Sequence, residues 1–265
     1  MPAGERIPAE PVSGLATEPL VVLGRIMPAS NQTFLCALGD EDASERAVYK
    51  PVAGERPLWD FPNGTLAGRE YATWLVSDAL GWEVVPRTLL RDGPHGPGMV
   101  QEWVDIDEAA DPVAVVRPHD RPAGYLHVLD AEDDRGRTVE LVHEDTEALL
   151  TIAVFDLLVN NTDRKGGHVL ALPDGRRQGV DHGICFHVDD KLRTVLWGFG
   201  GRAIDEPRLD AVARVARDAT LMGELGYYLD QDEIDAFVRR CERVLRQRRM
   251  PEIGPGWPAI PWPPF

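Results

Sequence analysis

The fold is decided by the stretch FDLLVNNTDRKGGHVL at residues 155–170, together with VDHGICF at residues 180–186. An apolar run of helical length leads into Asp163, and a short loop with two glycines and a strand-like segment follow. A second acidic residue, Asp181, then stands two residues before a glycine. Far upstream, the strand-like run Ala47-Val48-Tyr49-Lys50 ends in a lysine. The sequence therefore places two carboxylates and one ammonium at the ends of separate elements.

These residue types are the ones that metal-dependent phosphoryl transfer from ATP requires. One carboxylate takes the proton of the acceptor hydroxyl, a second holds the metal ions that bridge the phosphates, and a lysine neutralises phosphate charge. We predict Asp163 in the first role, Asp181 in the second and Lys50 in the third. A glutamate on the next helix would position the lysine, and Glu70 is the candidate within the predicted helix at 66–80. The alternative is that Glu70 pairs with an arginine on an exposed helix face.

Two further segments are expected to contact the nucleotide. The turn between the first two predicted strands contains Ser30, Asn31, Gln32 and Thr33. It stands where a phosphate-covering loop would lie, although no G-x-G-x-x-G pattern is present. The expected hinge, which would offer backbone groups to adenine, contains Gln101, Glu102, Trp103 and Val104. ATP with Mg²⁺ or Mn²⁺ is the expected cofactor set.

The motif FDLLVNNTDR followed by VDHGICF resembles the phosphatidylinositol 3-/4-kinase superfamily, and within it the type II phosphatidylinositol 4-kinases and their bacterial relatives. The run Val84-Val85-Pro86-Arg87-Thr88 after the predicted helix is similar to that family as well. Uncharacterised actinobacterial members of the superfamily look similar along the whole chain. The resemblance implies a kinase, with Asp163, Arg164 and Lys165 as catalytic residues. Lys165 stands near the place where lipid kinases often carry a histidine close to the γ-phosphate, so it would stabilise the transferring phosphoryl group.

Two departures from the family pattern affect the expected chemistry. The metal-binding asparagine of the family corresponds here to His168, so the resemblance implies a metal site of Asp181 and His168. Imidazole suits transition metals better than magnesium, which predicts a preference for Mn²⁺ or weak turnover. The cysteine cluster by which type II enzymes dock on membranes has no counterpart in residues 51–66. The expected acceptor is therefore a protein or small-molecule hydroxyl.

Composition limits the partners. Twenty-eight basic and 44 acidic residues give a net charge of −16, which opposes binding to nucleic acid. The first residues lack the apolar core of a signal peptide, and no stretch approaches the roughly 20 apolar residues of a membrane-spanning helix. Three cysteines without CxxC spacing indicate no zinc knuckle or disulfide framework. A cytoplasmic protein without integral membrane association is expected. Lys191, one of only three lysines, lies in a polar run and is interpreted as incidental.

The pattern along the chain predicts an α+β, bilobal protein-kinase-like fold, with an N-terminal antiparallel sheet lobe and a helical C-terminal lobe. Residues 1–17 are expected to be a flexible lead-in, 18–104 the N-lobe, 105–249 the C-lobe and 250–265 a Pro/Trp-rich tail lying extended against the body. The predicted strands are 20–26, 33–38, 46–51, 83–90 and 98–104. The predicted helices are 66–80, 146–160, 209–225 and 232–248. Residues 105–146 are expected to be an irregular connector apart from 138–143.

Three functions remain open from the sequence. The first is an active kinase, and the second is a nucleotide-binding pseudokinase with a regulatory role, suggested by His168 and the missing glycine loop. The third is a metallohydrolase built from His168, Asp181, His182 and His187. Asp156, within the apolar helix, either braces the catalytic loop or faces solvent.

Overall fold

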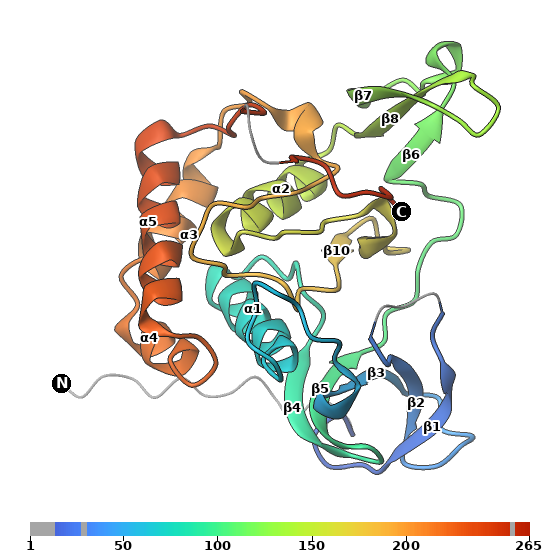
Figure 1. The fold of residues 1–265 in the computed structure, drawn as a ribbon, viewed down its shortest axis with the longest axis vertical. Helices are drawn as coiled ribbons and strands as arrows, with labels where there is room; N and C mark the ends of the chain where they lie inside the picture. Colours follow the sequence, from blue (N-terminus) through green and yellow to red (C-terminus); the bar gives the residue numbers. More distant parts are fainter. Residues whose placement is uncertain (1–13, 28–30, 255–257) are drawn as a thin grey trace.

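The computed structural model describes residues 14–27, 31–254 and 258–265. A five-stranded antiparallel sheet forms one end of the molecule, with helix α1 beside it, and the remaining helices form the other part (Figure 1). The α+β class and the order of an N-terminal sheet lobe before a helical lobe are thus confirmed. Within the described residues, no helix combines the length and the apolar character needed to cross a membrane.

The N-terminal sheet has the strand order β1-β2-β3-β5-β4. Its strands are β1 (Leu20–Arg25), β2 (Phe34–Leu38), β3 (Arg46–Pro51), β4 (Thr88–Gly93) and β5 (Gly96–Glu102). Burial alternates along β3, where Ala47 and Tyr49 enter the small core beneath the sheet. Because successive side chains of a strand point to opposite faces, Lys50 lies on the face away from that core.

Helix α1 (Leu66–Leu80) has the predicted bounds and ends at Gly81. Gly81 adopts a left-handed conformation with φ 71° and donates its N–H to the carbonyls of Ser77 and Asp78. Glycine tolerates this conformation without steric cost, so it stops the helix here. Predicted strand 83–90 is shorter than expected: Val84 and Val85 are buried in the main core, and β4 begins only at Thr88.

The C-terminal part is organised around α2 (Glu147–Val159), which is buried on nearly every side. Thr146 caps this helix by accepting the N–H of Leu149. The other elements are α3 (Glu206–Val215), α4 (Ala219–Leu225), α5 (Gln231–Gln247) and the short hairpin of β9 (Val169–Ala171) and β10 (Arg177–Gly179). The single helix predicted at 209–225 is two helices, because Asp218 caps a new one by accepting the N–H of Leu221.

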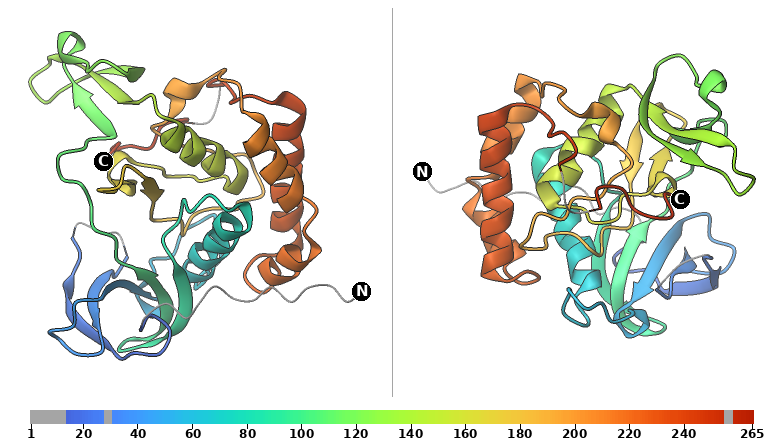
Figure 2. Two further views of the ribbon diagram at one scale, coloured as in Figure 1. Left: turned by 180° about the vertical axis from the view of Figure 1, so that it is seen from behind. Right: turned by 45° about the horizontal axis from the view of Figure 1, so that its top comes forward.

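The expected irregular connector contains a second sheet. Strands β6 (Val113–Val116), β7 (Tyr125–Glu132) and β8 (Thr138–Glu144) form a three-stranded antiparallel sheet that projects from the body (Figures 1 and 2). Only 138–143 was predicted there. The expectation for 105–146 was therefore wrong over β6 and β7.

Both ends of the described chain pack against the body of the protein, the N-terminal end through Leu15 and the C-terminal end through Ala259. Most of the predicted lead-in, 1–13, lies outside the described residues, and Leu15 beyond it is buried in the small core. The described residues of the tail form no helix or strand and include bends. The carbonyl of Ala259 accepts hydrogen bonds from the backbone N–H of Thr194 and from Nε1 of Trp197. Figure 2 shows the tail running across the helical part to the chain end.

Candidate active site

Lys50 is the centre of a group of charged side chains drawn from both parts of the molecule. Its Nζ lies 2.6 Å from Oε1 of Glu70 on α1 and 2.7 Å from Oδ1 of Asp181. The second carboxylate oxygen of Glu70 accepts the backbone N–H of His182 at 2.8 Å. Residues separated by up to 131 positions therefore meet at one ammonium. Pairing of a strand lysine with a helix glutamate is one of the two contacts that active protein kinases require.

The pKa values follow from these contacts. Burial by itself would lower the pKa of Lys50, but the charges of Asp181 and Glu70 outweigh it and raise that pKa. The charge of Lys50 holds the pKa of Asp181 well below its usual range. Burial raises the pKa of Glu70, and Lys50 opposes that effect. Because Glu70 accepts two short hydrogen bonds, we assign it the charged form.

Asp163 stands at the start of the loop that follows α2. The side chain of Asn161 fixes its backbone by accepting the Asp163 N–H at 3.0 Å. Nζ of Lys165 lies 3.4 Å from Oδ2 of Asp163. Burial raises the pKa of the Asp163 carboxyl, and the nearby Lys165 charge opposes that rise. A carboxylate with a raised pKa is a better proton acceptor near neutral pH.

Arg164 is completely buried and holds this loop in place. It donates Nε and Nη2 to the two carboxylate oxygens of Asp156, each at 2.8 Å. Nη1 donates to the carbonyls of His168 and Val180, and Nη2 lies 2.6 Å from Nε2 of His182. All five guanidinium donors are thus engaged. Arg164 leaves no group for a substrate, so the expected catalytic role is replaced by a positioning role, and Asp156 braces the loop rather than facing solvent.

His168 lies between the backbone carbonyl of Asp163 and the carboxylate of Asp181. Its Nδ1 lies 3.1 Å from the carbonyl of Asp163, and its Nε2 lies 3.4 Å from Oδ2 of Asp181. Burial lowers the pKa of His168, which favours neutral imidazole. With the proton on Nδ1, Nε2 carries a free lone pair directed at Asp181. A second ring nitrogen bonded to a carbonyl is the usual arrangement of a metal-binding histidine, so Asp181 and His168 fit a divalent cation.

The first segment expected to contact the nucleotide makes hydrogen bonds of its own. Ser30 is outside the described residues. Asn31 accepts the N–H of Arg56, and Gln32 donates its N–H to Gly54, just beyond β3. Thr33 is buried.

The hinge segment is partly occupied by its own hydrogen bonds. Gln101 is buried and donates its side-chain amide to Thr88. The N–H groups of Glu102 and Trp103 donate to the carbonyls of Arg87 and Arg46. Of the backbone groups of Glu102 and Trp103, only the carbonyls therefore remain available to adenine. The expected hinge role of Val104 stays a prediction.

The metallohydrolase alternative needs His182 and His187 beside His168 and Asp181. His182 is instead buried against Arg164, and His187 lies 3.0 Å from Nζ of Lys191. Four ligands therefore do not converge, and this alternative is not supported.

Two buried basic residues, Arg69 and Lys191, make ion pairs that the sequence did not indicate. Arg69, next to Glu70 on α1, is buried and pairs with Glu233 of α5 at 2.6 Å. The same guanidinium donates to the carbonyl of Cys185 at 2.9 Å. Lys191 is not incidental, since it is buried and contacts Asp60 at 3.0 Å. These pairs join positions more than 110 residues apart, and no local pattern marks them.

A cavity of about 440 Å³ lies elsewhere, between the N-terminal end of α1, strands β4 and β5, and Tyr228. Lys50, Asp163 and Asp181 do not line it. The candidate site is therefore defined by the charged side chains that meet at Lys50, and this cavity is not part of it.

The fold and this constellation define a two-lobed α+β protein of the kinase-like class. No family model matches the sequence. The chain is 52% identical over 264 residues to protein Rv2133c of Mycobacterium tuberculosis (strain ATCC 25618 / H37Rv), an alignment that covers 95% of this chain and 94% of that protein. The chain belongs to the family of protein Rv2133c.

Two solved structures are similar in fold. One is CtkA, a proinflammatory kinase of Helicobacter pylori, with a TM-score of 0.41 and 12% identity, covering 88% of this chain and 93% of that one. The other is the HipA, HipB and operator DNA complex of Shewanella oneidensis MR-1, with a TM-score of 0.37 and 12% identity, covering 85% of this chain and 65% of that one.

Proposed function

We propose that the protein is an ATP-dependent kinase of the phosphatidylinositol 3-/4-kinase-like superfamily that phosphorylates a protein or small-molecule hydroxyl in the cytoplasm. The observation that carries the proposal is the ammonium of Lys50 held between Glu70 and Asp181, with Asp163 and His168 beside it. Structural ion pairs also perturb pKa values. Here, however, the paired groups occur in the chain order and on the elements that phosphoryl transfer uses.

Each group has a definite task in this mechanism. Lys50 neutralises phosphate oxygens of ATP, and Glu70 keeps the ammonium in place. Asp163 orients the acceptor hydroxyl and takes its proton as the hydroxyl oxygen bonds to the γ-phosphorus. The bond from that phosphorus to the bridging oxygen breaks, and ADP leaves. Mg²⁺ or Mn²⁺ held by Asp181 and His168 would neutralise charge on the β- and γ-phosphates.

A second candidate is a nucleotide-binding pseudokinase with a regulatory role. The observation that favours it is His168, because a partly buried imidazole replaces the oxygen ligand that magnesium prefers. In that case ATP binds at Lys50 and Asp181 without transfer.

The test is nucleotide binding and loss of the γ-phosphate, measured with Mg²⁺ and with Mn²⁺. We compare the wild type with Asp163→Asn, Asp181→Asn and, as a control away from the site, Asp174→Asn, an exposed residue of the β9–β10 turn. The kinase proposal expects turnover that Asp163→Asn and Asp181→Asn abolish, with faster turnover in Mn²⁺. Binding without turnover supports the pseudokinase, and absence of nucleotide binding contradicts both.

A further inference from the structure

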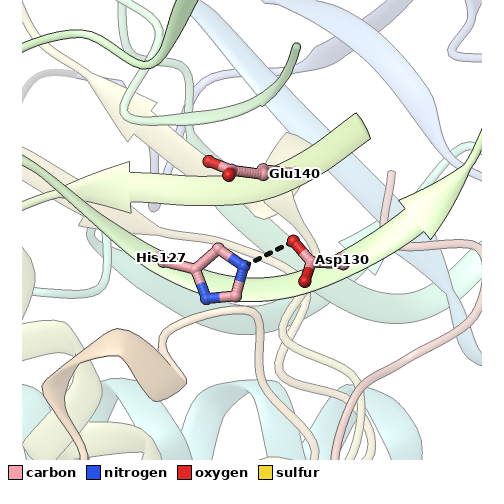
Figure 3. A group of neighbouring side chains, drawn as sticks. All are labelled: His127, Asp130 and Glu140. Atoms are coloured by element: carbon pink, nitrogen blue, oxygen red, sulfur yellow. Dashed lines mark hydrogen bonds and ion pairs between the residues drawn. The ribbon is translucent and has the colours of Figure 1, made fainter. Parts of the chain in front are cut away.

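A second group of possible metal ligands lies on the three-stranded sheet, separate from the kinase-like site. It consists of His127 and Asp130 on β7 and Glu140 on β8 (Figure 3). One ligand atom from each residue lies within 4.8 Å of the other two. We propose that these three residues form a binding site for a divalent transition metal, with Zn²⁺ as the expected occupant.

The backbone of β7 is shaped so that His127 and Asp130 share one face. Residues three apart on a regular strand point to opposite faces. Here the register shifts between His127 and Leu129, which inserts one extra residue. The two residues therefore pair with Val142 and Glu140, which are two apart on β8 and lie on one face. Bulges of this kind often re-aim side chains at functional sites.

The register also places two carboxylate residues directly opposite each other on neighbouring strands. Asp130 and Glu140 are direct cross-strand partners. Like charges in this relation destabilise a sheet. A cation between the carboxylates would remove that repulsion and join β7 to β8.

Glu140 supplies an independent indication that a ligand is needed. It is only 8% exposed, and its Oε2 is buried without a hydrogen-bond partner. Nε of Arg121 forms an ion pair with that oxygen at 3.6 Å, a separation beyond hydrogen-bond distance. A buried carboxylate oxygen without a hydrogen bond is costly, and coordination of a metal would satisfy it.

The donor set suits zinc. Nε2 of His127 lies 2.9 Å from Oδ1 of Asp130, and the metal would take the place of the proton between them. One imidazole nitrogen and two carboxylate oxygens give three protein ligands in the range that Zn²⁺ accepts, and a water molecule would complete a tetrahedral site. Since His127 and Asp130 are partly exposed, zinc can reach the site from solvent.

The experiment measures Zn²⁺ bound per chain by competition with a chromophoric chelator, without nucleotide. The full chain is compared with His127→Ala and Asp130→Ala, which truncate exposed side chains and remove no buried packing. His119→Ala is the matched control, because His119 is an exposed histidine that pairs with the neighbouring Asp120 and is not one of the three proposed ligands. An Asp181→Asn variant separates this site from the kinase-like one.

We expect wild type, His119→Ala and Asp181→Asn to retain the site. His127→Ala and Asp130→Ala should bind at this site at least about tenfold more weakly. Zn²⁺ should also raise the thermal midpoint of the wild type and of His119→Ala more than that of His127→Ala. The proposal is overturned if His127→Ala binds as much Zn²⁺ as tightly as the wild type, or if all binding disappears in Asp181→Asn.

Discussion

Lys165 is the residue whose contribution is most directly testable. Its ammonium lies 3.4 Å from Oδ2 of Asp163, the carboxylate assigned as the base. Donors aimed at charge that develops in the transition state contribute on the order of 10²–10³ in turnover. We expect Lys165→Ala to lower turnover by about that factor with little change in the affinity for ATP.

The measurement is steady-state phosphate transfer together with equilibrium nucleotide binding. Lys165→Arg keeps the charge and should recover part of the rate, because a guanidinium is a poorer point charge than an ammonium. Turnover in Lys165→Ala equal to that of the wild type would remove the role.

For single residues, the sequence predicts which charged side chains meet at Lys50, but it does not predict the partners of Arg164. Lys50, Glu70 and Asp181 were expected to meet, and Nζ of Lys50 lies 2.6 Å from a carboxylate oxygen of Glu70 and 2.7 Å from one of Asp181. Arg164 was expected to act on the substrate because it adjoins Asp163. Its complete burial depends on Asp156 and on carbonyls from two other segments, which the order of residues does not reveal.

Helix α1 depends on a clamp formed by Arg69. This buried arginine joins α1 to Glu233 at the start of α5 and to the backbone at Cys185. Glu233 also completes a capping box with Asp230. Since Glu70 follows Arg69 directly, the contacts of Arg69 also fix the position of the Glu70 carboxylate that pairs with Lys50.

We expect Glu233→Gln to destabilise the protein by about 3–5 kcal/mol, because a buried guanidinium loses its counter-charge. Urea unfolding measures this change. Turnover should fall while the folded variant still binds ATP, since only the position of Glu70 is disturbed. Glu242→Gln, on the exposed face of the same helix, is the control and should change stability by less than about 1 kcal/mol. Equal stability of the two variants would contradict the clamp.

Elements with strong periodicity or capping residues were predicted with nearly correct bounds, as α1, α2 and α5 show. The sheet of β6 and β7 was missed for two physical reasons. Strand β6 has only four residues. The irregular register of β7 interrupts the alternation that marks a half-buried strand.

The tail bonds the end of the described chain to the loop that follows Asp163. Gly166 donates its N–H to the carbonyl of Pro264 at 2.8 Å. A Cβ on Gly166 would lie 2.2 Å from the ring of Phe265, so only glycine allows this approach. Together with the contacts of Ala259, these bonds place the tail across the loop that carries Asp163 and Lys165.

We expect deletion of residues 258–265 to lower the thermal midpoint, by about 2–4 °C for each kcal/mol lost. The amide of Gly166 should exchange faster with solvent, because its acceptor is removed. Calorimetry and hydrogen exchange measure the two effects. Trp262→Ala, which removes an exposed ring, should leave both unchanged. An unaltered exchange rate at Gly166 after deletion would show that the tail does not cover the loop.

The clamp on α1 has a consequence for how the molecule responds to signals. In protein kinases the lysine–glutamate pair is formed or broken by repositioning the equivalent helix, often after phosphorylation of a loop. Here Arg69 bonds α1 to Glu233 at the start of α5 and to the carbonyl of Cys185, so the Lys50–Glu70 pair is formed in the unmodified chain. We therefore expect an enzyme whose turnover depends on the concentrations of nucleotide and acceptor and requires no prior phosphorylation of the chain.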